Sequence, residues 1–222
     1  MKIFLRKFIV LVSLLTFTLI VFHSLIFKKI FISVLERATE KAISIDDINI
    51  NFKKSFITFN NIKIYNSDDF EYEYFFTCKK IDLKLNIRTI FSSVIEFQNL
   101  IFYEPKIYLE IKNLSTNYQK DNISELEKFS PKYNPKVYPL KKKDRNIIIK
   151  KVITLKPKAN LNYENNYKIE NLNLSEMELN NVGNSTSNSQ HFKEVFKIVL
   201  LDLYFRIPDN SIKNKLKKLY KF

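Results

Sequence analysis

Between residues 43 and 112, apolar and polar residues alternate with the two-residue period that is typical of β-strands. The alternation slips where two polar residues stand together, at Asp46-Asp47, Asn60-Asn61, Gln98-Asn99 and within "IENLNL" at 169–174. Because one inserted residue would turn the following side chains to the other face, each slip predicts a β-bulge or a bend. Slips at matching points of successive strands predict a curved sheet. The alternative is that the polar pairs only mark hairpin turns.

Strand patterns resume at 146–156, 158–165 and 167–182, and short helices are expected at 88–94 and 121–129. Apolar residues at helical spacing predict an amphipathic helix near the C-terminus. Its stripe comprises Phe192, Val195, Phe196, Val199, Leu200 and Leu203. The basic segment after Pro208 is also amphipathic, and it either lies on an anionic membrane or packs on the domain.

The first thirty residues contain an uncharged run, Phe8–Phe27, which lies between Arg6-Lys7 and Lys28-Lys29. As a helix this run is about 30 Å long, which matches the hydrocarbon core of a bilayer. The run is too long for the core of a cleaved signal peptide, and no small-residue cleavage site follows it. We therefore predict an uncleaved transmembrane signal anchor, whose orientation the nearly equal flanking charges leave open. The anchor positions are Phe8, Leu11, Leu15, Leu19, Phe22 and Phe27.

These patterns predict an α+β fold. It consists of an N-terminal transmembrane helix, a curved and mainly antiparallel β-sheet with short helices, and C-terminal amphipathic helices. The expected organisation places the anchor at residues 1–30, a β-rich segment at 31–129 and a linker rich in Pro and Lys at 130–145. A second strand block of the same domain follows at 146–189, and the C-terminal helices occupy 190–222.

The composition excludes several kinds of site. With one Gly, the chain has no phosphate-binding glycine loop, and with one Cys, Cys78, it has no intrachain disulfide and no cysteine zinc site. No catalytic, metal-binding or cofactor-binding residue is assigned, and we expect a protein that is not an enzyme. The net charge of +14 suggests an anionic partner. It also fits a chain rich in Lys, Asn and Ile, and the anchor argues against nucleic acid.

The stretches "NNIKIYNSDDF" and "VIEFQNLIFYEPKIYLE" resemble the AsmA-like family of bacterial envelope proteins. Asn66 and Phe70 match the ends of a turn in that family, with Ser67 where Pro is usual. Pro105 and Glu110 match a hairpin further along. The resemblance implies an inner-membrane anchor and a periplasmic β domain with an apolar groove. It also implies a part in outer-membrane assembly or in phospholipid movement between membranes.

The expected function is therefore the handling of phospholipid, or of outer-membrane components, by a periplasmic protein anchored in the bacterial inner membrane. Expected partners are the bilayer, a phospholipid ligand and unidentified envelope proteins. The apolar strand positions would line the groove or fill an ordinary core. They are Ile62, Ile64, Leu83, Leu85, Leu100, Phe102, Ile107 and Leu109. The alternative function is that of a non-catalytic assembly or scaffold factor without lipid cargo.

Overall fold

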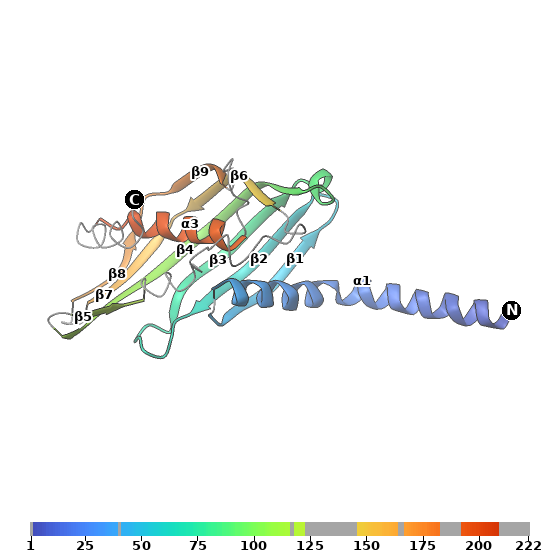
Figure 1. The fold of residues 1–222 in the computed structure, drawn as a ribbon, viewed down its shortest axis with the longest axis horizontal. Helices are drawn as coiled ribbons and strands as arrows, with labels where there is room; N and C mark the ends of the chain where they lie inside the picture. Colours follow the sequence, from blue (N-terminus) through green and yellow to red (C-terminus); the bar gives the residue numbers. More distant parts are fainter. Residues whose placement is uncertain are drawn as a thin grey trace, which may run out of the picture.

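The fold is a single open sheet with two helices from the ends of the chain packed against one face (Figure 1). The computed structural model describes residues 2–39, 41–115, 118–122, 146–163, 167–182 and 192–208. Its strands are β1 (Ile43–Asn51), β2 (Phe56–Tyr65), β3 (Tyr74–Leu85), β4 (Val94–Ser115), β5 (Tyr118–Asp121), β6 (Asn146–Leu155), β7 (Lys158–Tyr163), β8 (Tyr167–Asn173) and β9 (Met177–Val182). Its helices are α1 (Lys2–Thr39), the short 3₁₀ helix η1 (Ile87–Thr89) and α3 (Phe192–Phe205).

The sheet is mixed: most of its described strand pairings are antiparallel, as expected, but two pairings at its centre are parallel. β1 to β4 form an antiparallel meander, but β4 pairs in parallel with β6 and then with β7. β8 and β9 return antiparallel beside them. The segment between β5 and β6 is long enough for the crossover that parallel strands require. Parallel and antiparallel strands share the two-residue period, so the sequence pattern did not distinguish them.

Two of the four predicted polar pairs lie opposite one another in the sheet, because Asp47 pairs with Asn60, whereas Gln98-Asn99 and Asn171 lie at other levels. At the level of Asp47 and Asn60, two residues that are not buried stand between two buried ones on several strands or at their ends, and the register aligns these segments. They are Ile45–Ile48, Phe59–Ile62, Phe102–Pro105, Thr154–Pro157 and Leu174–Met177. The strands bend here without a change of register, and Asn61, Glu104 and Lys156 take left-handed φ values of 49°, 50° and 52°. True register shifts occur instead beside Gln98 and Asn171.

α1 is one continuous helix with two different surroundings. Its N-terminal part projects beyond the sheet, whereas its C-terminal part lies along it (Figure 1). Leu35 and Thr39 are buried there, while Phe8, Leu11 and Phe27 are exposed. The side chains of Leu15, Leu19 and Phe22 lie outside the described residues. Within the described part of the chain, no helix is both long enough and apolar enough to cross a membrane.

Several shorter expectations can be compared with the structure. The turn expected at 88–94 is η1, and the apolar stripe of α3 is confirmed at Val199, Leu200 and Leu203, which are buried. The helix expected to begin at Asp121 is wrong at that residue, because Asp121 ends β5. The rest of that helix, the linker at 130–145 and the second C-terminal helix lie outside the described residues.

Candidate apolar binding site

The inner face of the sheet, which we define as the face that α1 and α3 cover, is apolar from edge to edge. Residues that pair across six strands form transverse rows on this face. One row is Ile50, Ile57, Leu83, Leu100, Val152 and Leu179; the next is Ile48, Phe59, Ile81, Phe102, Thr154 and Met177; a third is Ile43, Ile64, Phe76, Ile107, Ala159 and Leu172. Thr154 is the one polar member, and its hydroxyl accepts the backbone N–H of Met177 at 2.9 Å.

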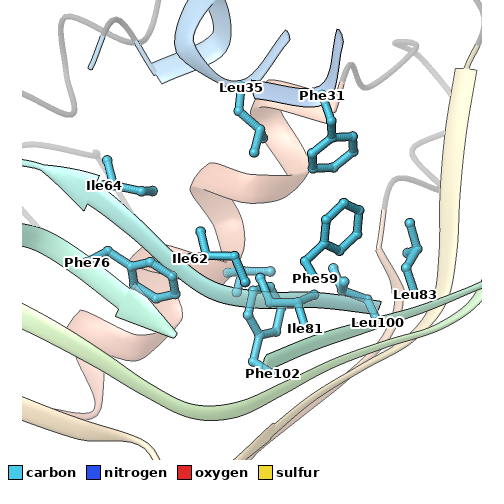
Figure 2. A pocket seen from close by; sticks show the side chains of 11 residues that line it. Phe31, Leu35, Phe59, Ile62, Ile64, Phe76, Ile81, Leu83, Leu100 and Phe102 are labelled. Carbon is cyan, nitrogen blue, oxygen red and sulfur yellow. The ribbon is translucent and has the colours of Figure 1, made fainter. Parts of the chain in front are cut away.

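An apolar pocket remains between this face and the two helices (Figure 2). Phe31 and Leu35 of α1 form one wall, and Val199 of α3 contributes to another. Phe31 stacks on Phe59 of β2 with ring centroids 4.3 Å apart. The strand residues of the lining are Phe59, Ile62, Ile64, Phe76, Ile81, Leu83, Leu100 and Phe102. No lining residue is polar, so the pocket favours a hydrocarbon group.

The pocket is small in this conformation. Its volume of about 40 Å³ has room for one or two water-sized groups, far less than an acyl chain needs. A longer apolar ligand therefore requires α1 or α3 to move away from the sheet.

The predicted groove positions divide into two groups. Five of them line the pocket: Ile62, Ile64, Leu83, Leu100 and Phe102. Ile107 and Leu109 are buried core residues elsewhere on the sheet, and Leu85 is half-buried outside the pocket. The sequence pattern therefore identified the inner face, but it could not tell the covered pocket from the core.

The sequence analysis missed the three lining residues that lie on helices and three of those that lie on strands. Phe31, Leu35 and Val199 belong to helices that are distant in sequence, and only the packing brings them together. Phe59, Phe76 and Ile81 had a usable signal, because they lie in the same rows as predicted positions. Ile81 pairs with the predicted position Phe102, and Phe59 pairs with Ile81. Phe76, for example, pairs with both Ile64 and Ile107.

Two of the positions that carry the family resemblance, Asn66 and Glu110, bind the same loop. Glu110 is 1% exposed, and its carboxylate accepts backbone N–H groups of Glu71 at 2.8 and 3.0 Å and of Tyr72 at 3.1 Å. These donors directly follow the turn that runs from Asn66 to Phe70. The Asn66 side chain donates to the carbonyl of Tyr72 at 3.2 Å, so Asn66 and Glu110 hold the same loop. Pro105, in contrast, lies at the bend of β4.

Two further groups, the half-buried Lys112 and the buried Asn122, also bind Glu110. Lys112 forms an ion pair with its carboxylate at 3.2 Å. Asn122 is fully buried, accepts the backbone N–H of Glu110 at 3.0 Å and donates to the carbonyl of Tyr108 at 2.7 Å. Asn122 thus continues the hydrogen bonding of β4 beyond the end of β5. None of these residues lines the apolar pocket.

Cys78 and the adjacent carboxylates Asp46 and Asp47 lie in different environments. Cys78 is buried on the inner face, and desolvation raises the pKa of its thiol to about 12, so little thiolate forms near neutral pH. Asp46 and Asp47 are both exposed at the bend, where Asn61 donates to Asp46 at 2.9 Å and Asn60 to Asp47 at 3.4 Å. No group of His, Cys, Asp and Glu side chains suited to a metal ion occurs among the residues that the structure describes.

Comparison with known proteins adds no identification. No family model, no curated protein and no solved structure matches the chain.

Proposed function

We propose that the chain is a membrane-anchored protein of the AsmA-like type, which holds the acyl chains of a phospholipid against the inner face of its sheet. The observation that carries the proposal is the apolar character of that face, row after row across the strands. An acyl chain would be shielded there while its headgroup stayed in water. The resemblance of the sequence adds the expected location, an inner-membrane anchor with the domain in the periplasm.

The anchor would be the N-terminal part of α1, and this part of the proposal rests on the sequence, because none of the described helices meets the requirement for crossing a membrane. Its supporting features are the uncharged run from Phe8 to Phe27 and the continuity of the helix into the domain. Apolar residues surround the axis of this part on every side, which is typical of a helix in lipid or in a large core. Within the described residues, most of the exposed large apolar side chains belong to α1. They are Phe4, Phe8, Val10, Leu11, Val12, Leu14, Leu25, Ile26, Phe27 and Ile30.

In this proposal α3 occupies the inner face when no lipid is bound. Leu200, Leu203 and Tyr204 of α3 are buried. The ring centroids of Tyr204 and Phe75 are 6.0 Å apart. At its end, Arg206 donates to the hydroxyl of Ser175 at 3.1 Å and to the carbonyl of Glu176 at 2.8 Å. Displacement of α3 exposes apolar surface that an acyl chain can cover in its place, so the exchange conserves buried area.

The second candidate is a scaffold or assembly factor that carries no lipid. The small volume of the pocket favours it, since the closed state has no space for a chain. The two candidates differ in what the inner face contacts besides α1 and α3.

The test is the amount of phospholipid retained by the full-length chain in native mass spectrometry, compared between two substitutions of Val199. Val199→Ala enlarges the pocket and Val199→Leu fills it, while lipid around the proposed anchor stays the same in both. Lipid handling predicts more retained phospholipid in Val199→Ala than in the wild type and less in Val199→Leu. Equal retention in all three folded proteins contradicts a lipid site and supports the scaffold.

A further inference from the structure

Three large apolar side chains are exposed on two turns at one end of the sheet. Outside α1, they are the exposed large hydrophobic residues of the described part of the chain: Phe52 at 62%, Ile87 at 48% and Phe91 at 93%. Phe52 lies in the turn between β1 and β2, and Ile87 and Phe91 lie in the loop between β3 and β4. Single exposed apolar residues are common on protein surfaces. The clustering of all three at one end is what requires an explanation.

The two turns are adjacent and well ordered. The backbone N–H of Leu85, at the end of β3, donates to the carbonyl of Ser55 in the β1–β2 turn at 2.9 Å. In the second loop, the Thr89 hydroxyl donates to the carbonyl of Asn86 at 2.8 Å and accepts the N–H of Glu96 at 2.9 Å. These hydrogen bonds connect the backbone of the loops, and the side chains of Phe52, Ile87 and Phe91 are exposed on them.

The same turns carry positive charge. Lys53 and Lys54 follow Phe52, and Arg88 follows Ile87; all three are exposed. Neither turn contains an acidic residue, as the stretches "FKKS" at 52–55 and "NIRTIFSS" at 86–93 show. Aromatic and aliphatic side chains next to Lys and Arg form the combination that enters the interface of an anionic bilayer.

The position of the turns agrees with such a contact. Figure 1 shows both turns at the end of the sheet from which the N-terminal part of α1 projects. At the end of the uncharged run, the ammonium group of Lys28 donates to the carbonyl of Asp46 on the edge strand β1 at 2.8 Å. The boundary of the proposed anchor is therefore attached to the sheet, and a bilayer surface there faces the two turns.

We propose that Phe52, Ile87 and Phe91 insert into the membrane interface as a second contact, with Lys53, Lys54 and Arg88 near the phosphate groups of anionic lipids. This inference rests on the proposed anchor. It gives the domain a fixed orientation on the bilayer, because the helix at one edge of the sheet and the two turns at its end would all contact the same membrane surface. It also places the row that contains Leu83 and Leu100 next to the membrane, where a lipid would enter.

The test uses the full-length chain in vesicles of phosphatidylcholine with a minority of phosphatidylglycerol. A polarity-sensitive fluorophore is attached to Phe91→Cys or Phe52→Cys, and to the control Asp68→Cys in the exposed loop between β2 and β3. Native Cys78 is buried, and its raised pKa keeps it unreactive. We expect a blue shift and a loss of iodide quenching at positions 91 and 52, with quenching by lipids labelled at interfacial depth. Asp68→Cys should stay accessible to iodide.

The outcomes separate this inference from the proposed function. If alkaline treatment releases the chain from the vesicles, the anchor is wrong, and the second contact fails with it. If the chain resists alkali but position 91 is quenched by iodide as strongly as position 68, the turns lie in water. That result overturns the second contact and leaves the anchor intact.

Discussion

At the scale of single residues, the buried carboxylate of Glu110 holds together parts of the chain that are distant in sequence. It accepts three backbone hydrogen bonds from the β2–β3 loop and an ion pair from Lys112. Glu110→Ala leaves these part-buried donors without their acceptor, which we expect to lower the free energy of unfolding by about 2–4 kcal/mol.

Chemical denaturation in detergent measures this loss, and Glu178→Ala is the matched control. Glu178 forms its ion pair with Lys151 at the surface, so its removal should change the stability by less than about 1 kcal/mol. Equal effects of the two substitutions would show that the Glu110 contacts do not stabilise the loop.

Cys78 gives a prediction about alkaline pH. Burial raises the pKa of its thiol from 9.0 to about 12, so the folded chain keeps a proton that the unfolded chain loses. This stabilisation is complete below about pH 9 and disappears as the pH rises towards 12. We expect the free energy of unfolding to fall by up to about 1.4 kcal/mol per pH unit in this window. The fall should be smaller in Cys78→Ala. Parallel pH profiles of the two proteins would contradict the assignment.

At the scale of elements, the bend across the sheet depends on residues that tolerate left-handed backbone. Asn61 has a φ of 49°, and Asn is the non-glycine residue best suited to this region. Asn61→Gly should leave the stability nearly unchanged, whereas Asn61→Val should lower it by about 1–2 kcal/mol. The control Asn49→Val lies on the neighbouring strand without left-handed backbone. Thermal unfolding distinguishes them, and a harmless Asn61→Val would mean that the bend is not strained there.

Sequence reasoning was most successful where a pattern repeats within one element. The paired polar residues at 46–47 and 60–61 located the bend, and helical spacing located the buried stripe of α3. It failed where a partner decides the structure. The parallel pairing of β4 with β6 follows from a crossover, not from a local pattern. Asp121, the first residue of the segment predicted as a helix, instead pairs with Ile111 of β4, and residues 123–129 of that segment lie outside the described residues.

The candidate site, too, could be predicted from the sequence only in part. Alternation placed Leu83, Leu100 and Phe102 on the inner face, and they line the pocket. The walls contributed by Phe31 and Val199 come from opposite ends of the chain, and the sequence has no signal that pairs them.

At the scale of the whole molecule, the proposed function depends on two apolar features, the N-terminal part of α1 and the inner face of the sheet. The proposed anchor predicts that Leu15→Lys, in the middle of the uncharged run, weakens insertion by about 3 kcal/mol. Alkaline extraction of membranes should then release a larger fraction of the chain. Ile30→Lys adds the same charge beyond the run, next to Lys28 and Lys29, and should not change the released fraction. Release of both variants to the same extent as the wild type would contradict an anchor at 8–27.

The central claim is that the inner face of the sheet contacts phospholipid, and site-specific photo-cross-linking in cells tests it most directly. Benzoylphenylalanine replaces Phe102, which lines the pocket, and in a control protein it replaces Tyr103, the next residue of β4, which lies outside the pocket. After irradiation, mass spectrometry identifies what is attached at each position. The account predicts a phospholipid adduct at position 102 and none at 103. Cross-links from position 102 only to α1 or α3, with no lipid, would contradict it.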